Sequence, residues 1–356
     1  MAVCVLIPAY EPEERFAEYA ALCAQRGPLV VVDDGSGPKF APIFEKIAAL
    51  PGCTVLHHEQ NKGKGAALKT GFAHILRFMA DCEGVVTADC DGQHALQDVQ
   101  RLCAAVLGQP QALSLGCRHF GPETPRRSMA GNRATSTAMR VLYGIELEDT
   151  QTGLRGIPRG LLEEVAALPG QRYEYELEML LWAKRKGVPM NVLTIETRYF
   201  DNNSGSHYDT VKDSLRICVP LLRGLAQYMA AGAASAVVDV AAYGLLVSFV
   251  FGGLSLVDRL MISAVLARIL SSLFNYLCNR RLPQMQRKAF WPTAARYYVL
   301  WVFQLAGSVL GTWALCAAFD ANELLAKYAV DILLSLLSYQ VQLRWVFGGK
   351  GEKADV

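Results

Sequence analysis

Two carboxylates one residue apart, Asp89 and Asp91, are the residues of this sequence best placed to do chemistry. They follow a short apolar run typical of a buried strand, and Gln93 comes two residues later, after a glycine that permits a tight turn. Their oxygens suit Mg²⁺ or Mn²⁺. Such an ion could stabilise a departing diphosphate, as transfer from a nucleotide-sugar requires. Because most isolated Asp-x-Asp tripeptides are surface turns, the assignment depends on the neighbouring motifs.

Polar residues also follow two other apolar runs, at 3–7 and 29–32. The residues at these two ends are Pro8, Tyr10, Glu11, Asp33 and Asp34. Ligands of open α/β sheets bind beyond the carboxyl ends of strands, so these side chains could contact the base and ribose of a nucleotide. Taken alone, each end could be an ordinary polar turn.

A glycine-bearing turn into a helix is predicted at residues 61–68, where the sequence reads NKGKGAAL. Free backbone amides at the start of that helix, together with Lys64, could bind phosphate. The alternative is a helix start whose lysines are solvated.

Short apolar runs alternate with longer helix-like stretches from the start of the chain to about residue 200. The runs cover residues 3–7, 29–32, 54–56, 85–88 and 113–115. This alternation predicts a mostly parallel sheet wrapped by helices. The first run is very short and has no basic flank, unlike a signal peptide. The ten cysteines form no CxxC pair, which indicates reduced thiols, so we expect this part to lie in the cytoplasm.

Four apolar stretches fill the second part, at about 228–251, 260–277, 297–318 and 324–347, and each approaches the ~20 residues that span a bilayer. The hydrophobic content of 52% fits a protein that lies partly in lipid. Basic residues gather between the second and third stretches, so the positive-inside rule places both termini in the cytoplasm. The 35 basic and 33 acidic residues leave a net charge of +2, which gives no case for nucleic-acid binding.

Three ionisable side chains fall inside the predicted spans: Asp239, Arg268 and Asp331. An ionisable group at mid-bilayer costs about 2.5–3.5 kcal/mol on insertion scales, so each calls for an explanation. One acid could neutralise Arg268, in which case the other needs its own partner or a water-filled cavity. Asn275, two turns beyond Arg268, extends this polar stripe.

Basic and apolar side chains are mixed in residues 126–143, which include Arg133, and again in residues 211–223. This mixture predicts helices that lie on anionic lipid, although solvated helices packed on the sheet are the alternative. The polar segment 202–208 could fold over the site as a lid, with Ser206 and His207 contacting phosphate. A lone histidine in a loop is, however, usually solvated.

Taken together and in this order, the motifs resemble glycosyltransferase family 2, and more narrowly the dolichol-phosphate mannose synthase-like polyprenyl-phosphate glycosyltransferases. The resemblance covers about residues 3–210 and includes GCR at 116–118 and DTQTGLR at 149–155. It implies an α/β GT-A (Rossmann-like) fold and an inverting transfer. It also implies metal ligation by Asp89, Asp91 and Gln93.

The acceptor in that family is a lipid phosphate, which is already anionic and needs no general base. Positive residues must then align it, and Arg118, just beyond the apolar run at 113–115, is our main candidate. The motif at 149–155 resembles the family's acceptor-side loop, which adds Asp149. The predicted acceptor and lid residues are Arg118, Arg133, Asp149, Ser206 and His207, and the predicted catalytic residues are Asp91 and Arg118.

The membrane part, about residues 224–347, resembles the GtrA-like family, which is proposed to move polyprenyl-phosphate sugars across the membrane. The four spans, their ionisable residues and the span ends NRR at 279–281 and RWVF at 344–347 carry this resemblance. We expect Arg268 to meet the lipid phosphate. The alternative is a passive anchor with a buried ion pair.

The sequence therefore predicts a GT-A domain at 1–210, a juxtamembrane amphipathic helix at 211–223, an all-α four-helix transmembrane domain at 224–347 and a cytoplasmic tail at 348–356. The predicted reaction transfers a sugar from a nucleotide-sugar to undecaprenyl phosphate at the cytoplasmic leaflet of the inner membrane, and flipping of the product could follow. A UDP-hexose or UDP-N-acetylhexosamine is favoured as donor. GDP-mannose, the downstream glycan and a homo-oligomer stay open.

Two other functions fit part of the sequence. A processive polysaccharide synthase would carry a Gln-x-x-Arg-Trp motif before its spans, and residues 150–223 hold none. A transporter whose first half only binds a nucleotide-sugar is disfavoured, because every carboxylate that the metal site needs is present.

Overall fold

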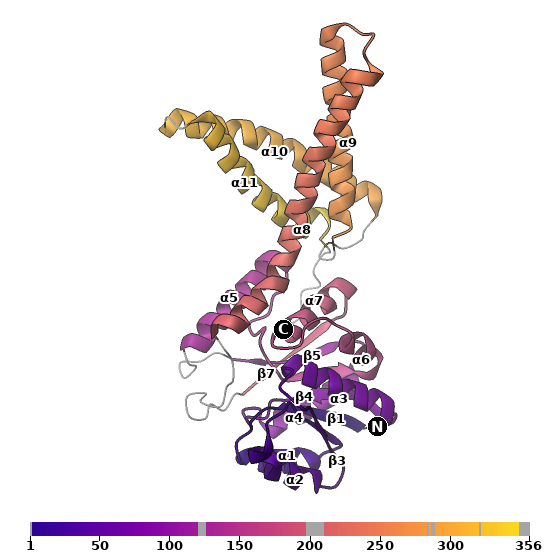
Figure 1. Cartoon of the computed structure of the whole chain (residues 1–356), viewed down its shortest axis with the longest axis vertical. Coiled ribbons are helices and arrows are strands. Elements are labelled where there is room, and N and C mark those ends of the chain that lie inside the picture. Colours follow the sequence, from indigo (N-terminus) through magenta and orange to yellow (C-terminus); the bar gives the residue numbers. More distant parts are fainter. Residues whose placement is uncertain are drawn as a thin grey trace. The chain divides into compact units, whose positions relative to one another are not determined.

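The computed structural model describes residues 2–119, 126–196, 210–282, 285, 289–319 and 322–348, with backbone alone at 126–128 and 210–215. The chain divides into two compact units (Figure 1). The first, the sheet unit, comprises Met1–Arg140 and Ile145–Pro220. The second, the helical unit, comprises Val141–Gly144 and Leu221–Val356. Each unit buries a hydrophobic core of its own.

A seven-stranded mixed sheet forms the centre of the sheet unit, in the order β3-β2-β1-β4-β6-β5-β7. Its strands are β1 (Ala2–Ala9), β2 (Leu29–Asp33), β3 (Cys53–His57), β4 (Cys82–Thr87), β5 (Leu113–Arg118), β6 (Arg155–Pro158) and β7 (Met190–Ile195). β1 pairs in parallel with β2 and β4, as do β2 with β3 and β5 with β7. β6 runs antiparallel to both β4 and β5, so these two strands share one direction.

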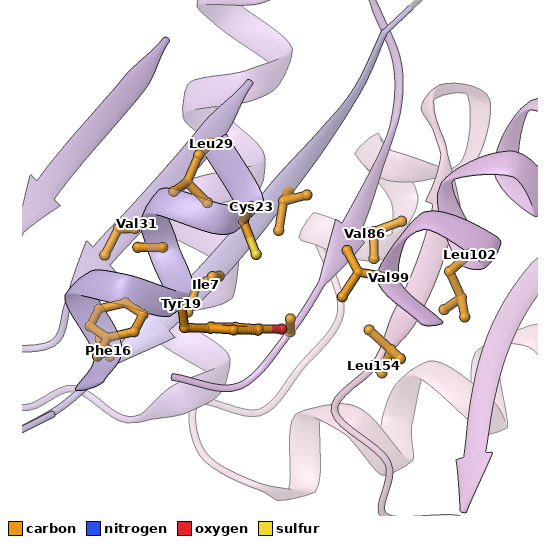
Figure 2. Packing of buried hydrophobic residues seen from close by; sticks show 14 of the residues in the cluster. Ile7, Phe16, Tyr19, Cys23, Leu29, Val31, Val86, Val99, Leu102 and Leu154 are labelled. Atoms are coloured by element: carbon orange, nitrogen blue, oxygen red, sulfur yellow. The ribbon is translucent and has the colours of Figure 1, made fainter. Parts of the chain in front are cut away.

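Helices cover both faces of this sheet. They are α1 (Arg15–Ala24), α2 (Ala41–Ala48, after the 3₁₀ turn η1, Pro38–Phe40), α3 (Lys64–Phe78), α4 (Leu96–Gly108) and α6 (Arg159–Ala166). Of the other helices, α7 (Glu174–Lys186) packs against α3, and α5 (Arg126–Tyr143) follows β5 in the chain. Successive strand residues point to opposite faces. Ile7 therefore packs in one core with Phe16 of α1 (Figure 2), while Leu6 meets α3, where a Cβ at Gly71 would collide with it. β2 is buried along its whole length, as a central parallel strand should be. The α/β fold predicted from the sequence is confirmed.

The helical unit is built from four long helices. They are α8 (Thr210–Leu245, which begins in the sheet unit), α9 (Leu256–Arg280), α10 (Phe290–Phe319) and α11 (Glu323–Val341). Each has the length and apolar composition needed to cross a membrane, which confirms the predicted all-α membrane part. Their large apolar side chains point outward, as with Phe249 and Trp313, which are 82% and 70% exposed. A surface of exposed apolar side chains is suited to contact with lipid.

The first and the last of these four helices each end in a short π-helical segment. η3 (Leu246–Val250) continues α8 and η4 (Gln342–Val346) continues α11. π-helical turns of this kind shift the side chains that follow relative to a regular helix and are frequent at functional sites. Beside η4 lies an aromatic core that includes Tyr276, Tyr297 and Tyr339.

Candidate active site

The carboxyl ends of β1, β2 and β4 lie at one edge of the sheet because these strands are parallel neighbours. β5 shares their direction through β6, so its end at Arg118 lies at the same edge. The motifs that follow β1, β2, β4 and β5 therefore lie where ligands of open α/β sheets bind. Pro8 pairs with Val32 at the end of β1, and Tyr10 follows it there.

Asp33 and Asp34 are buried at the end of β2 and hold neighbouring loops. Asp33 Oδ1 accepts hydrogen bonds from the backbone amide and hydroxyl of Ser36, at 2.9 and 2.6 Å. Asp34 accepts from the backbone amides of Lys62 and Gly63, at 2.9 and 2.7 Å. Asp34 therefore positions the turn that leads into α3, in addition to any contact it makes with a ligand.

Glu11 has an unusual backbone conformation. Its φ of 48° places a non-glycine residue in the left-handed region, which is uncommon and costs free energy. Its backbone amide donates to Ser36 Oγ at 2.8 Å, which ties the end of β1 to the turn after β2. Strained positions of this kind concentrate at functional sites.

A compact charged cluster lies at the end of β4. Lys64 Nζ, in the first turn of α3, is 2.6 Å from Asp89 Oδ1 and 2.9 Å from Glu176 Oε1 of α7. His94 Nε2 is 3.2 Å from the other Asp89 oxygen. Glycines make this approach possible, because a Cβ at Gly153 would collide with the Asp89 carboxylate.

The charges of this cluster depend strongly on one another. Burial would raise the pKa of Asp89, but Lys64 and His94 hold it well below its usual range. Burial would lower the pKa of Lys64, but Asp89 and Glu176 raise it above its usual value. At Asp91, burial and the charge of Asp89 outweigh the effects of His94 and Lys64 and raise its pKa. The charge of Asp89 is thus already balanced by Lys64, whereas the charged form of Asp91 is disfavoured by its surroundings.

The donor set at Asp89 and Asp91 fits a divalent ion. A cation would relieve the repulsion that raises the pKa of Asp91. Asp91 also accepts from the Gln93 backbone amide at 3.0 Å, which shapes the turn around Gly92. Among the described residues no group of three histidine, cysteine or acidic side chains surrounds one point. Mg²⁺ usually takes one or two carboxylates and completes its shell with substrate phosphates, which is compatible with this pair.

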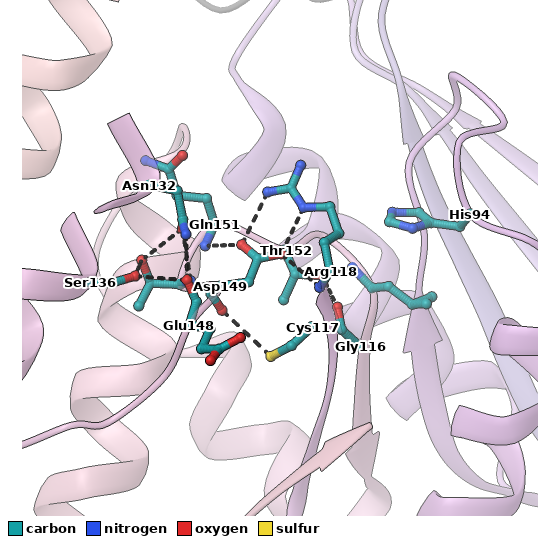
Figure 3. A network of polar contacts seen from close by, with 12 residues as sticks. His94, Gly116, Cys117, Arg118, Asn132, Ser136, Glu148, Asp149, Gln151 and Thr152 are labelled. Atoms are coloured by element: carbon teal, nitrogen blue, oxygen red, sulfur yellow. Dashed lines mark hydrogen bonds and ion pairs between the residues drawn. The ribbon is translucent and has the colours of Figure 1, made fainter. Parts of the chain in front are cut away.

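Arg118 and Asp149 form a bidentate pair at the end of β5 (Figure 3). Arg118 Nε and Nη2 donate to the two Asp149 oxygens at 2.7 and 3.0 Å, and the backbone amide of Arg118 adds a bond of 3.2 Å. Asp149 is fully buried, while the Arg118 side chain keeps 15% of its surface exposed. The guanidinium is therefore held in one orientation and is accessible from one side.

Asn132 of α5 fixes the loop that carries Asp149 (Figure 3). Its Nδ2 donates to the carbonyl oxygen of Glu148, and its Oδ1 accepts from the Thr150 backbone amide at 3.1 Å. Ser136, one turn on, also donates to the Glu148 carbonyl, at 3.1 Å. Arg133, which the sequence placed in the acceptor set, is exposed on α5, whereas Asn132 is 1% exposed.

Several residues of this edge carry no local sequence signal that singles them out. Glu176 and Asn132 belong to this group, whereas Arg155 closes the motif at 149–155 but was given no role there. Arg155 is fully buried, and donates from Nε to the Thr152 carbonyl at 3.0 Å and from Nη1 to the Glu176 carbonyl. Their burial is what distinguishes these three side chains, and burial is visible only in the fold. Ser206 and His207 lie outside the described residues.

The ionisable residues of the spans form two separate pairs. Asp239 lies 3.3 Å from Arg268 Nη2 and accepts from Ser271 at 2.8 Å. Asp331 pairs at 2.6 Å with Lys327, one turn earlier on α11, and accepts from Ser308 of α10 at 2.6 Å. Each acid therefore has its own basic partner.

Comparisons with known proteins agree with this geometry. Residues 4–166 match the model of glycosyl transferase family 2, and residues 227–347 match the GtrA/DPMS transmembrane domain. The UDP-N-acetylglucosamine--dolichyl-phosphate N-acetylglucosaminyltransferase of Methanococcus voltae is 27% identical over 217 residues, 55% of this chain and 86% of the relative. The dolichyl-phosphate beta-glucosyltransferase of Saccharomyces cerevisiae is 26% identical over 220 residues, 55% of this chain and 64% of the relative.

A solved structure with a similar chain path is glucosyl-3-phosphoglycerate synthase from Mycobacterium tuberculosis, in complex with Mn²⁺, UDP-glucose and phosphoglyceric acid. It covers 62% of this chain and 79% of its own, with a TM-score of 0.46 and 18% sequence identity. From the family models, the chain is a membrane-bound glycosyltransferase with a family 2 catalytic domain of GT-A fold. Its second part is a GtrA/DPMS transmembrane domain, so both resemblances found in the sequence are confirmed.

Proposed function

We propose that the enzyme transfers one monosaccharide from a nucleotide-sugar to polyprenyl phosphate, with inversion at the anomeric carbon. The observation that carries this proposal is that an acidic cluster at Asp89 and an oriented arginine at Arg118 follow strands of the same direction. One can hold a diphosphate leaving group and the other an anionic acceptor. Relatives that are named as dolichyl-phosphate sugar transferases support the same kind of acceptor.

The donor is held at the end of β4. Asp89 and Asp91, with Gln93, would hold Mg²⁺ or Mn²⁺, which when bound neutralises charge on the leaving diphosphate. Lys64 brings a second positive charge to the same place, and its ammonium can donate to a phosphate oxygen once Asp89 engages the metal. A UDP-hexose or UDP-N-acetylhexosamine is the favoured donor, and GDP-mannose is the alternative.

The acceptor phosphate is aligned by Arg118. Its oxygen is already anionic, so it forms the new bond to the anomeric carbon while the bond to the diphosphate breaks and the electron pair leaves with the nucleotide. No side chain has to remove a proton. Asp149 and Asn132 contribute by fixing the direction of the Arg118 guanidinium, which supplies the geometric part of the catalysis.

We further propose that the catalytic domain and both termini lie on the cytoplasmic side of the inner membrane. Three basic residues support this orientation by the positive-inside rule: Arg280 at the end of α9, Arg281 directly after it, and Arg296 near the start of α10. Delivery of the product across the membrane would be the task of the helical unit, with the Asp239–Arg268 pair as its polar centre. Unchanged outward delivery in an Arg268→Ala variant would count against this task and favour a passive anchor.

The transfer is tested with the full-length protein in nanodiscs, undecaprenyl phosphate and radiolabelled UDP-glucose, UDP-N-acetylglucosamine or GDP-mannose. We expect a lipid-linked product with at least one donor, and a rate about 10²–10³-fold lower in Asp91→Asn, the usual cost of losing one charge-stabilising group. Asp81→Asn is the matched control, because Asp81 is exposed and precedes β4 at the opposite edge. No lipid-linked product with any donor, from folded protein, would refute the proposal and favour a domain that only binds nucleotide-sugar.

A further inference from the structure

The helical unit contains a cavity of about 400 Å³ to which all four long helices contribute. This volume lies in the range of small-molecule binding sites, roughly 300–1,000 Å³. Its polar and aromatic wall residues include Tyr228 of α8, Asn275 of α9, Tyr297, Trp301 and Gln304 of α10, and Gln342 of η4. Three aromatic rings and three carboxamides thus face one space inside a unit that is otherwise apolar on its outside.

The chemistry of this wall is polar but uncharged. None of the described residues that line the cavity is ionisable at neutral pH as an acid or a base. Carboxamides donate and accept hydrogen bonds at the same time, which matches hydroxyl groups that do the same. Aromatic faces suit the C–H face of a pyranose ring. A wall of this composition fits a neutral sugar and offers no positive charge to a phosphate.

One carboxamide of the wall is fixed by the protein. Gln342 Nε2 donates to Tyr228 Oη at 3.2 Å and to Ser338 Oγ at 3.1 Å, and its Oε1 accepts from Asn279 Nδ2 at 3.1 Å. These bonds hold Gln342 in the π-helical segment η4 at 1% exposure. The wall is therefore preorganised on the side that η4 forms.

A second carboxamide of the wall, that of Asn275, has an acceptor oxygen that a ligand could use. Asn275 Oδ1 is buried and has no hydrogen-bond partner among the residues that the structure describes. An acceptor buried in this way costs free energy unless a partner reaches it. A ligand hydroxyl in the cavity would supply that partner.

Two arginines lie close in the chain to residues of this wall, one at the end of α9 and one near the start of α10. Arg296 directly precedes Tyr297 on α10, and its Nη1 donates to the Trp345 carbonyl at 3.1 Å. Arg280, at the end of α9, donates to Tyr276 Oη at 3.2 Å and to Thr293 Oγ1 at 3.1 Å. A ligand with a neutral sugar and an anionic phosphate finds both kinds of partner in this part of the unit.

We propose that this cavity binds the sugar of a polyprenyl-phosphate monosaccharide, with the lipid phosphate at the adjacent arginines. The inference rests on the proposed function, since this ligand is the product of the proposed transfer. It gives the helical unit a site that recognises the glycosylated lipid and rejects the unglycosylated one.

The test uses preformed ligand, so that it does not depend on catalysis. Full-length protein in nanodiscs is irradiated with polyprenyl phosphate N-acetylglucosamine that carries a diazirine on its acyl group, and separately with polyprenyl phosphate glucose that carries one on the sugar. Labelled peptides are identified by mass spectrometry. We expect label at α8 and α10 around Tyr228 and Trp301, displaced by unlabelled glycosylated lipid and not by bare polyprenyl phosphate.

Matched variants separate the cavity from the lipid-facing surface. A Cβ at Gly232, which lines the cavity on α8, would meet no atom within 4 Å, and the same holds for Gly244 on the same helix. Gly232→Leu should fill the cavity and lower labelling about tenfold or more, the scale of a lost pocket contact, whereas Gly244→Leu should not. Trp301→Ala should act likewise, with the exposed Trp313→Ala as its control.

Two results would overturn the inference: label that neither Gly232→Leu nor Trp301→Ala reduces, and label confined to the sheet unit with both probes. Transfer activity is measured on the same preparations. Label in the cavity without transfer would refute the proposed reaction alone, and transfer without label in the cavity would refute this inference alone.

Discussion

The two units of this enzyme bury polar groups in opposite ways. In the sheet unit the fully buried polar groups include ions, as with Asp34, Asp149 and Arg155, which are at most 2% exposed. In the helical unit the ionic side chains stay partly exposed, with Arg268 at 61% and Lys327 at 47%, while the fully buried polar groups include the neutral amides Asn279 and Gln342.

The difference follows from what surrounds each unit. A strand-end site can offset the desolvation of an ion with backbone amides, as Asp34 does, and with water at its mouth. In a bilayer neither is at hand, because the helix amides are already bonded and the solvent is hydrocarbon. Buried charges can therefore serve catalysis in the sheet unit, whereas in the helical unit neutral amides can bind a ligand at a lower desolvation cost. Substitutions in each unit test this contrast.

The largest effect is expected from Arg118→Ala. Removal of the oriented guanidinium leaves Asp149 buried without its partner and the acceptor phosphate without its cation, so kcat/KM for the lipid should fall about 10²–10³-fold. Steady-state transfer at saturating donor measures this. The control is Arg101→Ala, which breaks a pair with Asp98 in which the arginine is 52% exposed. Equal losses in both variants would mean that burial of the ion pair is irrelevant to catalysis.

A smaller loss is expected from Gly153→Ala. The added Cβ collides with the Asp89 carboxylate and must displace it from Lys64, so the transfer rate should fall about tenfold to a hundredfold, as for a misplacement of about 1 Å. Gly160→Ala, on α6, meets no atom within 4 Å and should leave the rate unchanged. If Gly153→Ala kept full activity, the position of Asp89 seen here would not be the catalytic one.

Asn132→Ala tests the support of the acceptor side. Its loss leaves the Thr150 amide without its acceptor and the Glu148 carbonyl with Ser136 as its donor, which should lower the free energy of unfolding by about 1–3 kcal/mol. KM for the lipid acceptor should rise while KM for the donor stays unchanged, because Asn132 acts through Asp149 and Arg118. Thr137→Ala, an exposed change on the same helix, is the control. A rise in both KM values would indicate general unfolding instead of a positioning role.

The smallest effect is expected in the helical unit from Lys327→Gln. The Lys327–Asp331 pair is about half exposed on both sides, and an i,i+4 ion pair of this kind contributes only about 0.3–0.5 kcal/mol in water. A thermal-denaturation midpoint in nanodiscs close to that of the wild type would support the contrast between the units. A large drop would show that this pair is buried by lipid and belongs with the ions of the sheet unit.

Local sequence patterns predict much of this architecture. Apolar runs that end in Asp33-Asp34 or Asp89-x-Asp91 mark strand ends, and the rule that ligands bind beyond such ends predicted that these residues share an edge. Span length and the outward apolar residues of α8 to α11 likewise follow from composition alone. Roles assigned to single residues, including those of Ser206 and His207, stay predictions.

Tertiary structure decided which charges meet. The antiparallel strand β6 is only four residues long and carries no periodic signal, yet it brings the end of β5 to the edge that holds Asp89. Glu176 reaches Lys64 because α7 packs against α3. Arg268 of α9 pairs with Asp239 of α8, which is a contact between helices, whereas the pair of Lys327 and Asp331 lies one turn apart within α11. The Asp89-x-Asp91 motif was evident from local sequence, since carboxylates after a strand are a short-range pattern. Its lysine and second carboxylate depend on contacts between distant segments, which only the packed fold determines.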